Sequence, residues 1–349
     1  MRILQVCPLY YPAIGGVEQH VKNISERLAH ENDITIFTCD PSGQLPKEET
    51  INGVKVRRFH SFSPQNAYHL SFEMMSALRR SSFDIVHGHN YHALPLFFSR
   101  YCESSKFIVS AYYHGHGHTV FRDFLLGLYK PFGRSIFKYA NRVVALSNFE
   151  KSILVKDFCI DDRKIAVIPY GINMPEFSSL QRERGEYKKI LYIGRLEQYK
   201  GVQYVVKAMQ LLDTEIHLEI IGKGPYKGYL VNLTKYLGIQ RRVSFLEDLP
   251  REELLKRYAS ANLFVMLSRY ESFSIVVAEA LAAKVPCIVA KTSALIEWID
   301  NNNCFGIDYP LSIERLAQLI NSVISKQVGD VELWDWNNVV SEIIGVYRE

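Results

Sequence analysis

Two glutamates lie eight positions apart in SRYESFSIVVAEALAAKVP, residues 268–286, with Glu271 before an apolar run and Glu279 inside it. Ser272 or Ser274 is expected to cap a helix through this run, because serine accepts a hydrogen bond from free N–H groups at a helix start. At about 1.5 Å per residue the two carboxylates are roughly 10 to 12 Å apart, too far to act on one glycosidic bond. They fit two parts of one extended ligand, with Glu279 accepting ribose hydroxyls and Glu271 binding a sugar. The alternative is a helix-dipole partner and a salt bridge.

Two cations follow a strand-like segment in LYIGRLEQYKGV, with Arg195 at its end and Lys200 before the next helix. Beside glycine turns at a strand end, they match the two negative charges of a diphosphate. IIGKGP repeats the pattern, because Gly222 and Gly224 predict another tight turn. The alternative is an ordinary pair of solvated surface charges.

A third candidate for phosphate binding is PAIGGVEQHVKNISERL, which follows the first strand-like segment and continues into a helical pattern. Gly15 and Gly16 predict a turn whose backbone N–H groups can approach an anion closely. The pair is not a GxGxxG fingerprint, which disfavours a nicotinamide dehydrogenase. Close packing is the alternative reason for two glycines here.

Short apolar runs alternate with longer amphipathic stretches along the chain, which is typical of βα units and parallel sheets. Residues 170–187 interrupt this rhythm with Gly, Pro, Ser and charge, and we expect a linker there. The pattern predicts two doubly wound α/β domains with ligands at the carboxyl ends of the strands, in the cleft between domains. The expected strands are RILQVC, DITIFT, VKVRRF, DIVHGH, FIVSAY, RVVALS and KIAVIP, then KKILYIGR, IHLEIIG, RVSFLE, NLFVML and PCIVA.

The composition limits the class of protein. The chain has 349 residues, 48% hydrophobic and 22% charged, which favours a folded soluble protein of two domains. A net charge of +4 suits phosphate ligands or an anionic membrane surface and is too small to indicate nucleic-acid binding. Six cysteines without a CxxC pair indicate reduced thiols. We expect a cytoplasmic protein without a signal peptide or a membrane-spanning segment.

A set of motifs in order resembles the large family four of retaining glycosyltransferases, which have the GT-B fold. The resemblance covers nearly the whole chain. It implies an acceptor-binding Rossmann-like domain of residues 1–172, joined by a C-terminal helix at 332–349, and a domain of residues 185–328 that binds the nucleotide sugar. The motifs are GGVEQHV, FDIVHGHNYHALP, NRVVALSNFEKSIL, VIPYGIN, YIGRLEQYKGV, IIGKGP, the segment from SFLEDLP to PCIVA, and WDWNNVVSEIIGVY.

The resemblance also implies roles for single residues. The expected catalytic residues are His114, Glu271, Arg195 and Lys200. The donor site is expected to comprise Gly15, Gly16, Arg195, Lys200, Gly222, Phe273, Ser274, Ile275 and Glu279. The donor is a UDP-, GDP- or ADP-sugar, the acceptor is a hydroxyl, and no metal is required. The cations stabilise the leaving diphosphate, and attack on the face from which it departs retains the anomeric configuration.

Two departures from the family pattern concern the site. Where the family commonly has Glu-Gly-Phe-Gly, this chain has Glu-Ser-Phe-Ser at 271–274, so the backbone amides are expected to approach the sugar less closely. Alignment on Ser110 places Tyr112 at the position of the family histidine. We choose His114, the nearest histidine, over Tyr112.

The neighbouring histidines have functional and structural interpretations. His116 and His118 are further candidates for the active site, and alternate histidines on an extended strand could bind Zn²⁺. The intervening glycines favour a flexible loop instead. His87, His89 and His92 lie in HGHNYH, as either acceptor contacts or hydrogen-bonded lining.

Residues 121–142 interleave aromatic and aliphatic residues with cations at 122, 130, 134, 138 and 142, the last four spaced by four. Such a stripe could lie on an anionic membrane and meet a lipid-linked acceptor. An ordinary amphipathic helix over the sheet explains the pattern equally well.

Two other functions are considered. A nucleotide-sugar epimerase would need an additional acid and base, which the sequence does not clearly show. A catalytically silent nucleotide-sugar-binding protein would fit the two serines, but the intact charged residues at 195, 200, 271 and 279 argue against it.

Overall fold

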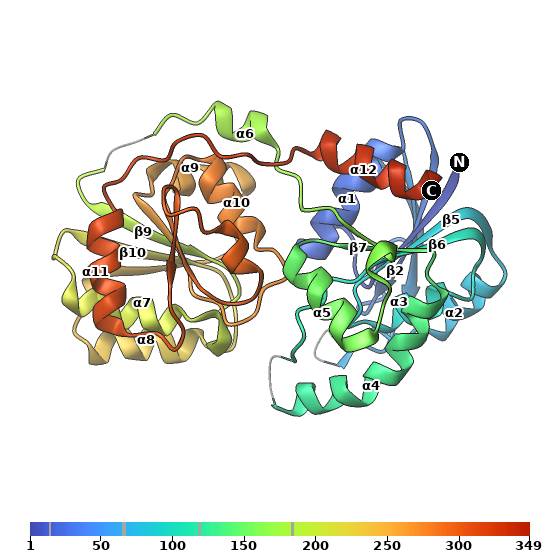
Figure 1. Ribbon diagram of the computed structural model, residues 1–349, viewed down its shortest axis with the longest axis horizontal. Helices are drawn as coiled ribbons and strands as arrows, with labels where there is room; N and C mark the ends of the chain where they lie inside the picture. The colour runs from blue at the N-terminus through green and yellow to red at the C-terminus, as the bar shows by residue number, and fades with distance from the viewer. Residues whose placement is uncertain (14, 65–67, 118–119, 183–184) are drawn as a thin grey trace. The chain divides into compact units, whose positions relative to one another are not determined.

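The computed structural model describes residues 1–13, 15–64, 68–117, 120–182 and 185–349. The chain forms two compact units, Met1–Gly171 with Trp334–Glu349, and Ile172–Leu333. Each is a largely parallel sheet covered by helices, so the predicted pair of doubly wound α/β units is present (Figure 1). The expected linker belongs mostly to the second unit, where it forms α6 (Met174–Ser178) and buries Phe177.

The first unit contains an eight-stranded sheet in the order β3-β4-β2-β1-β5-β6-β7-β8. All neighbouring strands are parallel except β3 and β4. The order reverses between β1 and β5, which is where ligands bind in doubly wound sheets. The strands are β1 (Arg2–Val6), β2 (Asp33–Asp40), β3 (Glu48–Ile51), β4 (Val54–His60), β5 (Ser82–His89), β6 (Glu103–Ser110), β7 (Arg142–Ala145) and β8 (Ile165–Val167).

Strand β3 is not among the strands predicted from the sequence. It pairs with β4 through the register Ile51↔Val54, which leaves Asn52-Gly53 as a two-residue turn. Both turn residues have positive φ, 49° and 81°. Asn-Gly between two strand-like runs is the strongest short hairpin signal, so the sequence did contain the information.

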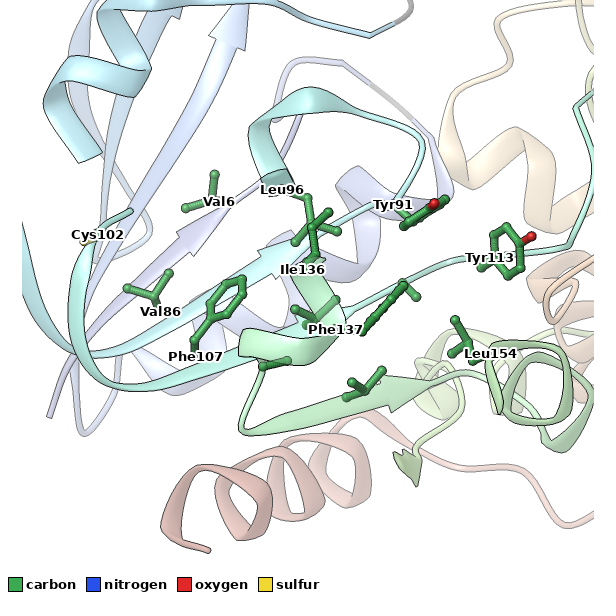
Figure 2. Packing of buried hydrophobic residues seen from close by; sticks show 14 of the residues in the cluster. Val6, Val86, Tyr91, Leu96, Cys102, Phe107, Tyr113, Ile136, Phe137 and Leu154 are labelled. Carbon is green, nitrogen blue, oxygen red and sulfur yellow. The ribbon is translucent and has the colours of Figure 1, made fainter. Parts of the chain in front are cut away.

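The helices of the first unit cover both faces of its sheet. Side chains from α2, α4 and α5, including Leu78, Ile136 and Leu154, pack with strand residues such as Val86 in one hydrophobic cluster (Figure 2). The helices are α1 (Gly16–Leu28), α2 (Phe72–Arg79), α3 (Leu94–Ser99), α4 (Val120–Tyr139), α5 (Asn148–Phe158) and α12 (Trp336–Arg348). The side chains of residues 120–122 in α4 are outside the described part.

The last helix, α12, returns to the first unit and packs beside α1, as the family resemblance implies (Figure 1). Asp335 begins it with a capping box, because its side chain accepts from the N–H of Asn338 and the Asn338 side chain accepts from the N–H of Asp335. Val339 and Ile343 are buried on its inner face. The helix thus closes a unit whose remaining residues lie more than 160 positions earlier in the chain.

The second unit contains a six-stranded parallel sheet in the order β11-β10-β9-β12-β13-β14, which reverses between β9 and β12. Strand β14 is not among the strands predicted from the sequence. The strands are β9 (Lys188–Ile193), β10 (Ile216–Ile221), β11 (Val243–Leu246), β12 (Leu263–Met266), β13 (Cys287–Ala290) and β14 (Cys304–Ile307). The remaining helices are α7 (Val202–Ala208), α8 (Lys227–Tyr236), α9 (Arg251–Ser260), α10 (Ile275–Ala282) and α11 (Ile313–Val323). Within the described ranges, no helix combines the length and apolar character needed to cross a bilayer.

Candidate functional site

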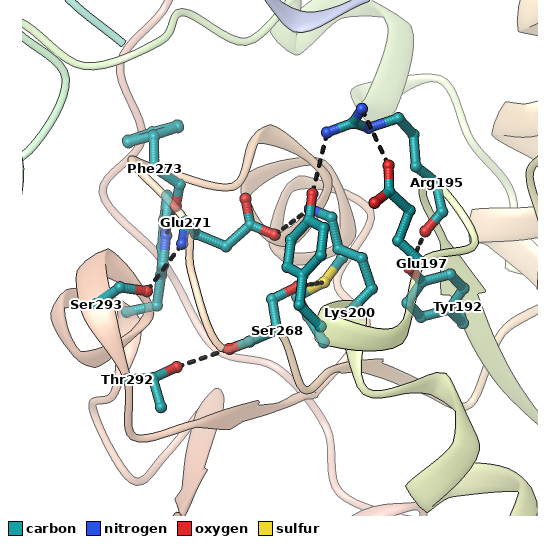
Figure 3. A network of polar contacts seen from close by, with 12 residues as sticks. Tyr192, Arg195, Glu197, Lys200, Ser268, Glu271, Phe273, Thr292 and Ser293 are labelled. Carbon is teal, nitrogen blue, oxygen red and sulfur yellow. Dashed lines mark hydrogen bonds and ion pairs between the residues drawn. The ribbon is translucent and has the colours of Figure 1, made fainter. Parts of the chain in front are cut away.

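Three of the predicted charged residues of the second unit, Arg195, Lys200 and Glu271, lie where its strand order reverses. β9 leads into Arg195 and the short 3-10 helix η3 (Gln198–Lys200), and the neighbouring β12 leads into the loop that carries Glu271. Both connections leave the carboxyl ends of adjacent strands, the usual ligand position in a doubly wound sheet. Figure 3 shows the resulting polar network.

Lys200 and Glu271 form an ion pair in this network, with Nζ 2.6 Å from Oε1. The two side chains are only 13% and 15% exposed. Burial disfavours the charged form of Lys200, but the adjacent Glu271 carboxylate outweighs this, so the pKa of Lys200 is raised. Lys200 is therefore a fixed cation at neutral pH, and Glu271 holds it in place.

The loop that carries Glu271 is fixed by the 3-10 helix η6 (Ser293–Trp298) and the residue before it (Figure 3). The Glu271 N–H donates to Ser293 Oγ at 2.9 Å, and the Thr292 hydroxyl donates to the Ser268 carbonyl at 2.7 Å. Trp298 Nε1 donates to the Phe273 carbonyl at 2.8 Å. These three bonds orient the loop before any ligand binds. They join segments far apart in the chain and could not be predicted from local patterns.

Arg195 is the more accessible cation, with 60% of its side chain exposed. Its guanidinium lies 3.3 Å from Glu197 Oε1 and donates to the Tyr199 hydroxyl at 3.0 Å. Tyr199 also lies beneath Lys200, whose Nζ is 5.2 Å from the ring centroid. Tyr199 therefore links the two predicted phosphate-binding cations.

Two of the predicted donor-site residues, Ser274 and Ile275, form the start of α10. Ser274 is the N-cap and adopts a left-handed conformation with φ of 80°, which glycine adopts more readily than serine. Ser274, one of the two serines predicted for this position, is thus the N-cap, but its side chain makes no capping hydrogen bond. Ser274 Oγ is buried and has no hydrogen-bond partner in the described part of the chain. The Ser274 side chain thus accepts no bond from the first N–H groups of α10, whereas the Val277 N–H donates to the Ser274 carbonyl at 3.1 Å. Anion binding at this helix start stays a prediction.

Glu279 lies in α10 and is 10% exposed. Its Oε1 is 2.6 Å from Arg251, and its Oε2 accepts a hydrogen bond from the Tyr258 hydroxyl at 2.9 Å. The salt-bridge interpretation of Glu279 is therefore confirmed. A carboxylate has about four acceptor positions, so these two contacts leave capacity for the ribose hydroxyls that we predict. Arg251 and Tyr258 were not predicted as site residues, because no spacing rule connects α9 with α10.

In the first unit, Gly15 and Gly16 begin α1 after β1, as predicted. A Cβ at Gly15 would collide with the Glu18 side chain, and one at Gly16 would lie 3.3 Å from the Tyr170 hydroxyl. The contact at Gly15 is with the end of a flexible side chain, so close packing is an explanation for Gly16 alone. Binding of an anion by this turn remains a prediction.

The candidate catalytic histidine follows β6. His114 is half-buried, and its ring stacks on His92 at a centroid distance of 4.9 Å and an angle of 20°. His116 lies farther out, with Nδ1 3.8 Å from Asp123. His118 lies outside the described residues. His114 is less exposed than His116, which is compatible with the prediction that His114 is the active-site residue.

Tyr112, the alternative to His114, is buried, and its hydroxyl forms two hydrogen bonds. The hydroxyl lies 2.7 Å from His20 Nδ1 and 3.1 Å from His89 Nδ1. His89 Nε2 lies 2.6 Å from Gln5 Oε1. Because an amide oxygen only accepts, His89 donates from Nε2 and accepts from Tyr112 at Nδ1, which makes His20 the donor to Tyr112. Tyr112 thus belongs to an internal network.

The same network continues to α12. The Gln5 amide donates to the Tyr347 hydroxyl at 3.0 Å, and that hydroxyl lies 2.8 Å from His87 Nδ1. His87 Nε2 lies 2.8 Å from Ser110 Oγ. For His87 and His89, hydrogen-bonded lining is therefore the correct interpretation, and their ring nitrogens are not available to an acceptor.

These buried histidines predict an acid-sensitive first unit. Burial lowers the pKa of His20 and of His87 from 6.5 to about 3 and lowers that of His89 well below 6.5. Because the folded-state values lie below the unfolded value, the stabilisation is present above pH 6.5 and is lost as the pH falls toward 3. Between pH 7 and pH 6, these three groups lower the free energy of unfolding by on the order of 2 kcal/mol. His92, whose pKa burial lowers to about 4, adds to this loss, and Glu150, whose pKa burial raises to about 8, opposes it.

Urea unfolding at the two pH values measures this loss. His87→Gln should reduce the loss by about 0.7 kcal/mol, because one proton fewer is taken up on unfolding. A loss in His87→Gln equal to that of the wild type would contradict a neutral, buried His87.

Two further features concern ligand binding. Within the described ranges, no group of three or more His, Cys, Asp or Glu residues is arranged to hold a metal ion. A cavity of about 680 Å³ lies between α1 and α12, lined among others by Arg27, Asn337 and Ser341. None of the predicted site residues lines it.

Two family models match consecutive parts of the chain. Residues 14–175 match Glycosyltransferase Family 4, and residues 174–334 match Glycosyl transferases group 1. An uncharacterized glycosyltransferase of Methanocaldococcus jannaschii is 30% identical over 100% of this chain and 98% of its own length. This chain belongs to the group 1 glycosyltransferases. The predicted family is thereby confirmed.

Other relatives of this glycosyltransferase extend the comparison. The GDP-mannose:cellobiosyl-diphosphopolyprenol alpha-mannosyltransferase of Xanthomonas oryzae pv. oryzae is 24% identical over 100% of this chain and 97% of its own. Sucrose-phosphate synthase from Thermosynechococcus elongatus has a TM-score of 0.82 at 19% identity, with 99% and 98% of the two chains covered. Anabaena HepE in complex with UDP-glucose has a TM-score of 0.78 at 16% identity, with 100% and 99% covered. These structures confirm the predicted GT-B fold.

Proposed function

We propose that this glycosyltransferase transfers a sugar from a nucleotide-diphosphate sugar to a hydroxyl acceptor with retention of the anomeric configuration. The observation that carries the proposal is the buried Lys200–Glu271 pair beside Arg195 at the point where the strand order reverses. A preformed pair of cations there matches a diphosphate leaving group. The transfer uses no metal and serves the assembly of a glycan, glycolipid or polysaccharide.

The second unit binds the donor in this proposal. Lys200 and Arg195 bind the diphosphate, together with the N–H groups at Ser274 and Ile275. Gly222 lets the chain backbone approach the nucleotide, and Glu279 accepts the ribose hydroxyls. Glu271 and Phe273 contact the sugar. The first unit binds the acceptor and contributes His114 as a catalytic side chain, with Gly15 and Gly16 as a further anion-binding turn.

The proposed reaction step follows from the charge that develops. As the bond from the anomeric carbon to the diphosphate breaks, positive charge grows on the sugar and negative charge grows on the leaving oxygen. Lys200 and Arg195 stabilise that oxygen electrostatically. The acceptor oxygen forms its bond to the anomeric carbon on the face from which the diphosphate departs, and the acceptor proton passes to the departing phosphate.

The acceptor is proposed to be lipid-linked, and the chain to act in the cytoplasm at the inner face of the cell membrane. The name of the Xanthomonas oryzae relative specifies a diphosphopolyprenol acceptor. The names of the relatives include both GDP-mannose and UDP-glucose, so the nucleotide has to be determined by experiment.

A thermal-shift panel of UDP, GDP, ADP and TDP and their sugars, without metal, tests donor binding. A ligand that binds only the folded protein at 100 times its Kd adds about 2.7 kcal/mol of stability and raises the Tm. One nucleotide should stabilise the wild type, while Lys200→Ala and Glu279→Ala should abolish its effect. Lys235→Ala, an exposed lysine on α8, is the matched control and should keep it.

Two outcomes would contradict the proposal. If no nucleotide stabilises the wild type, with or without added metal, the donor-site assignment fails. If the nucleotide sugar binds but is not consumed with any lipid-linked acceptor, the chain is a silent binding protein. Conversion of the bound sugar without an acceptor would indicate an epimerase.

A further inference from the structure

Helix α4 carries a stripe of exposed apolar side chains. Phe124, Leu128 and Phe132 are 62%, 57% and 61% exposed. Residues four apart on a helix lie on the same side, so these three form one continuous line. Tyr139, near the end of the helix, is 66% exposed. Single exposed apolar residues are common, but a contiguous line indicates an interaction surface.

The opposite side of α4 already supplies the helix with its packing. Leu126, Ile136 and Phe137 are buried in the hydrophobic cluster of the first unit (Figure 2). An ordinary amphipathic helix over a sheet has polar residues on its solvent side. This interpretation accounts for the buried side of α4 and leaves the apolar stripe unexplained.

Two of the four cations that are spaced by four in the sequence are not available to a ligand. Lys130 pairs with Asp157, and Arg142 pairs with Glu349, so these two do not form a free basic stripe. The side chain of Arg122 lies outside the described part.

Arg134 and Lys138 remain exposed beside the stripe, and neither forms an ion pair within the described part of the chain. At the end of the helix, Arg100 lies over the Tyr139 ring at 5.5 Å and hydrogen-bonds Ser135 at 2.6 Å. Asp123, also on α4, is 45% exposed and lies 3.8 Å from His116. The described surface next to the apolar stripe thus has two unpaired cations and one carboxylate, and its net charge is positive.

We propose that Phe124, Leu128 and Phe132, together with Arg134 and Lys138, form a docking surface for a bilayer that contains anionic phospholipid. We call these five residues the α4 surface. The aromatic and aliphatic side chains enter the boundary between headgroups and acyl chains, while the two cations contact lipid phosphates. The proposal rests on the lipid-linked acceptor proposed above, because a docked enzyme meets such an acceptor in the plane of the membrane.

Charge favours a bilayer over a second copy of this chain. A symmetric dimer through the α4 surface would place Arg134 and Lys138 opposite their own copies, and like charges repel. An anionic bilayer compensates both cations at once.

Co-sedimentation of the full chain with vesicles, without donor, tests the α4 surface. The wild type should bind phosphatidylcholine vesicles that contain phosphatidylglycerol and bind phosphatidylcholine alone much more weakly. Arg134→Gln with Lys138→Gln should lower the affinity about 25-fold, since each cation near an anionic surface contributes about fivefold. Phe124→Ser with Phe132→Ser should lower it by at least about tenfold. Lys235→Gln with Tyr236→Ser, an exposed pair on α8, is the matched control and should bind as the wild type does.

Equal binding to both vesicle types, or no binding, would overturn the proposal. A wild-type dimer in gel filtration that Phe124→Ser dissociates would overturn it in favour of contact between copies. Lys200→Ala should still bind vesicles, and the Phe124→Ser, Phe132→Ser variant should still be stabilised by the nucleotide in solution. Failure of docking and failure of donor binding are thus measured separately.

Discussion

Lys200→Met is expected to lower kcat/KM for glycosyl transfer by about a thousandfold. Lys200 is the better fixed of the two cations, because Glu271 holds it at 2.6 Å in a site that is largely closed to solvent. Loss of one preorganised group that stabilises developing charge typically costs 10²- to 10³-fold in rate. Initial rates with the donor found by the thermal-shift panel, measured with a lipid-linked acceptor, give the effect.

The same variant separates catalysis from stability. Lys200→Met leaves the Glu271 carboxylate buried without its cation, which should lower the free energy of unfolding by about 3 kcal/mol. Glu271→Gln in the same chain should restore most of that stability without restoring the rate. Lys256→Met, which breaks an exposed pair with Glu252, should change neither quantity measurably. Recovery of the rate in the double variant would mean that Lys200 only supports the fold.

Gly222→Ala is expected to destabilise the second unit by about 3 to 5 kcal/mol. Gly222 has φ of 146°, a conformation that is essentially restricted to glycine. A Cβ there would also collide with the carbonyl oxygen of Gly194, in the turn after the neighbouring strand. Neither backbone segment can move easily, because the Gly222 N–H donates to the Leu246 carbonyl and the Gly194 N–H donates to the Ile221 carbonyl. Backbone strain and the steric collision therefore both contribute to the loss of stability in Gly222→Ala.

Urea unfolding of Gly222→Ala measures the effect, and Gly228→Ala is the matched control. Gly228 lies in α8, six residues farther along, and a Cβ there meets no atom within 4 Å. Alanine favours a helix, so Gly228→Ala should leave the stability unchanged or raise it by about 0.5 kcal/mol. If both variants unfold at the same urea concentration, the turn at Gly222 is not constrained as we describe.

Local patterns in the sequence were sufficient to predict the architecture of the two units. Alternation of apolar runs with amphipathic stretches predicted two parallel α/β units, because buried strands and surface helices have different periodicities. The two strands that were missed, β3 and β14, are four residues long and lie at sheet edges. Edge strands bury less surface and therefore have a weaker pattern. The glycine turn of Asn52-Gly53 was nevertheless visible.

The partners of the site residues could not be predicted from the sequence. Lys200 and Glu271 are 71 positions apart, and they meet because β9 and β12 are neighbours in the sheet. Arg251 reaches Glu279 from another helix for the same kind of reason. Spacing rules describe neighbours along one element, whereas these contacts depend on the order of the strands.

The sequence by itself determined the family, the fold class and the identity of the charged residues, because each follows from local order in the chain. Only the tertiary structure decided which of them are paired and which cations of α4 remain exposed. It showed that Tyr112 is taken up in a buried network and that the apolar residues of α4 lie on two sides. These properties depend on what packs against each side chain, and burial is set by the whole fold.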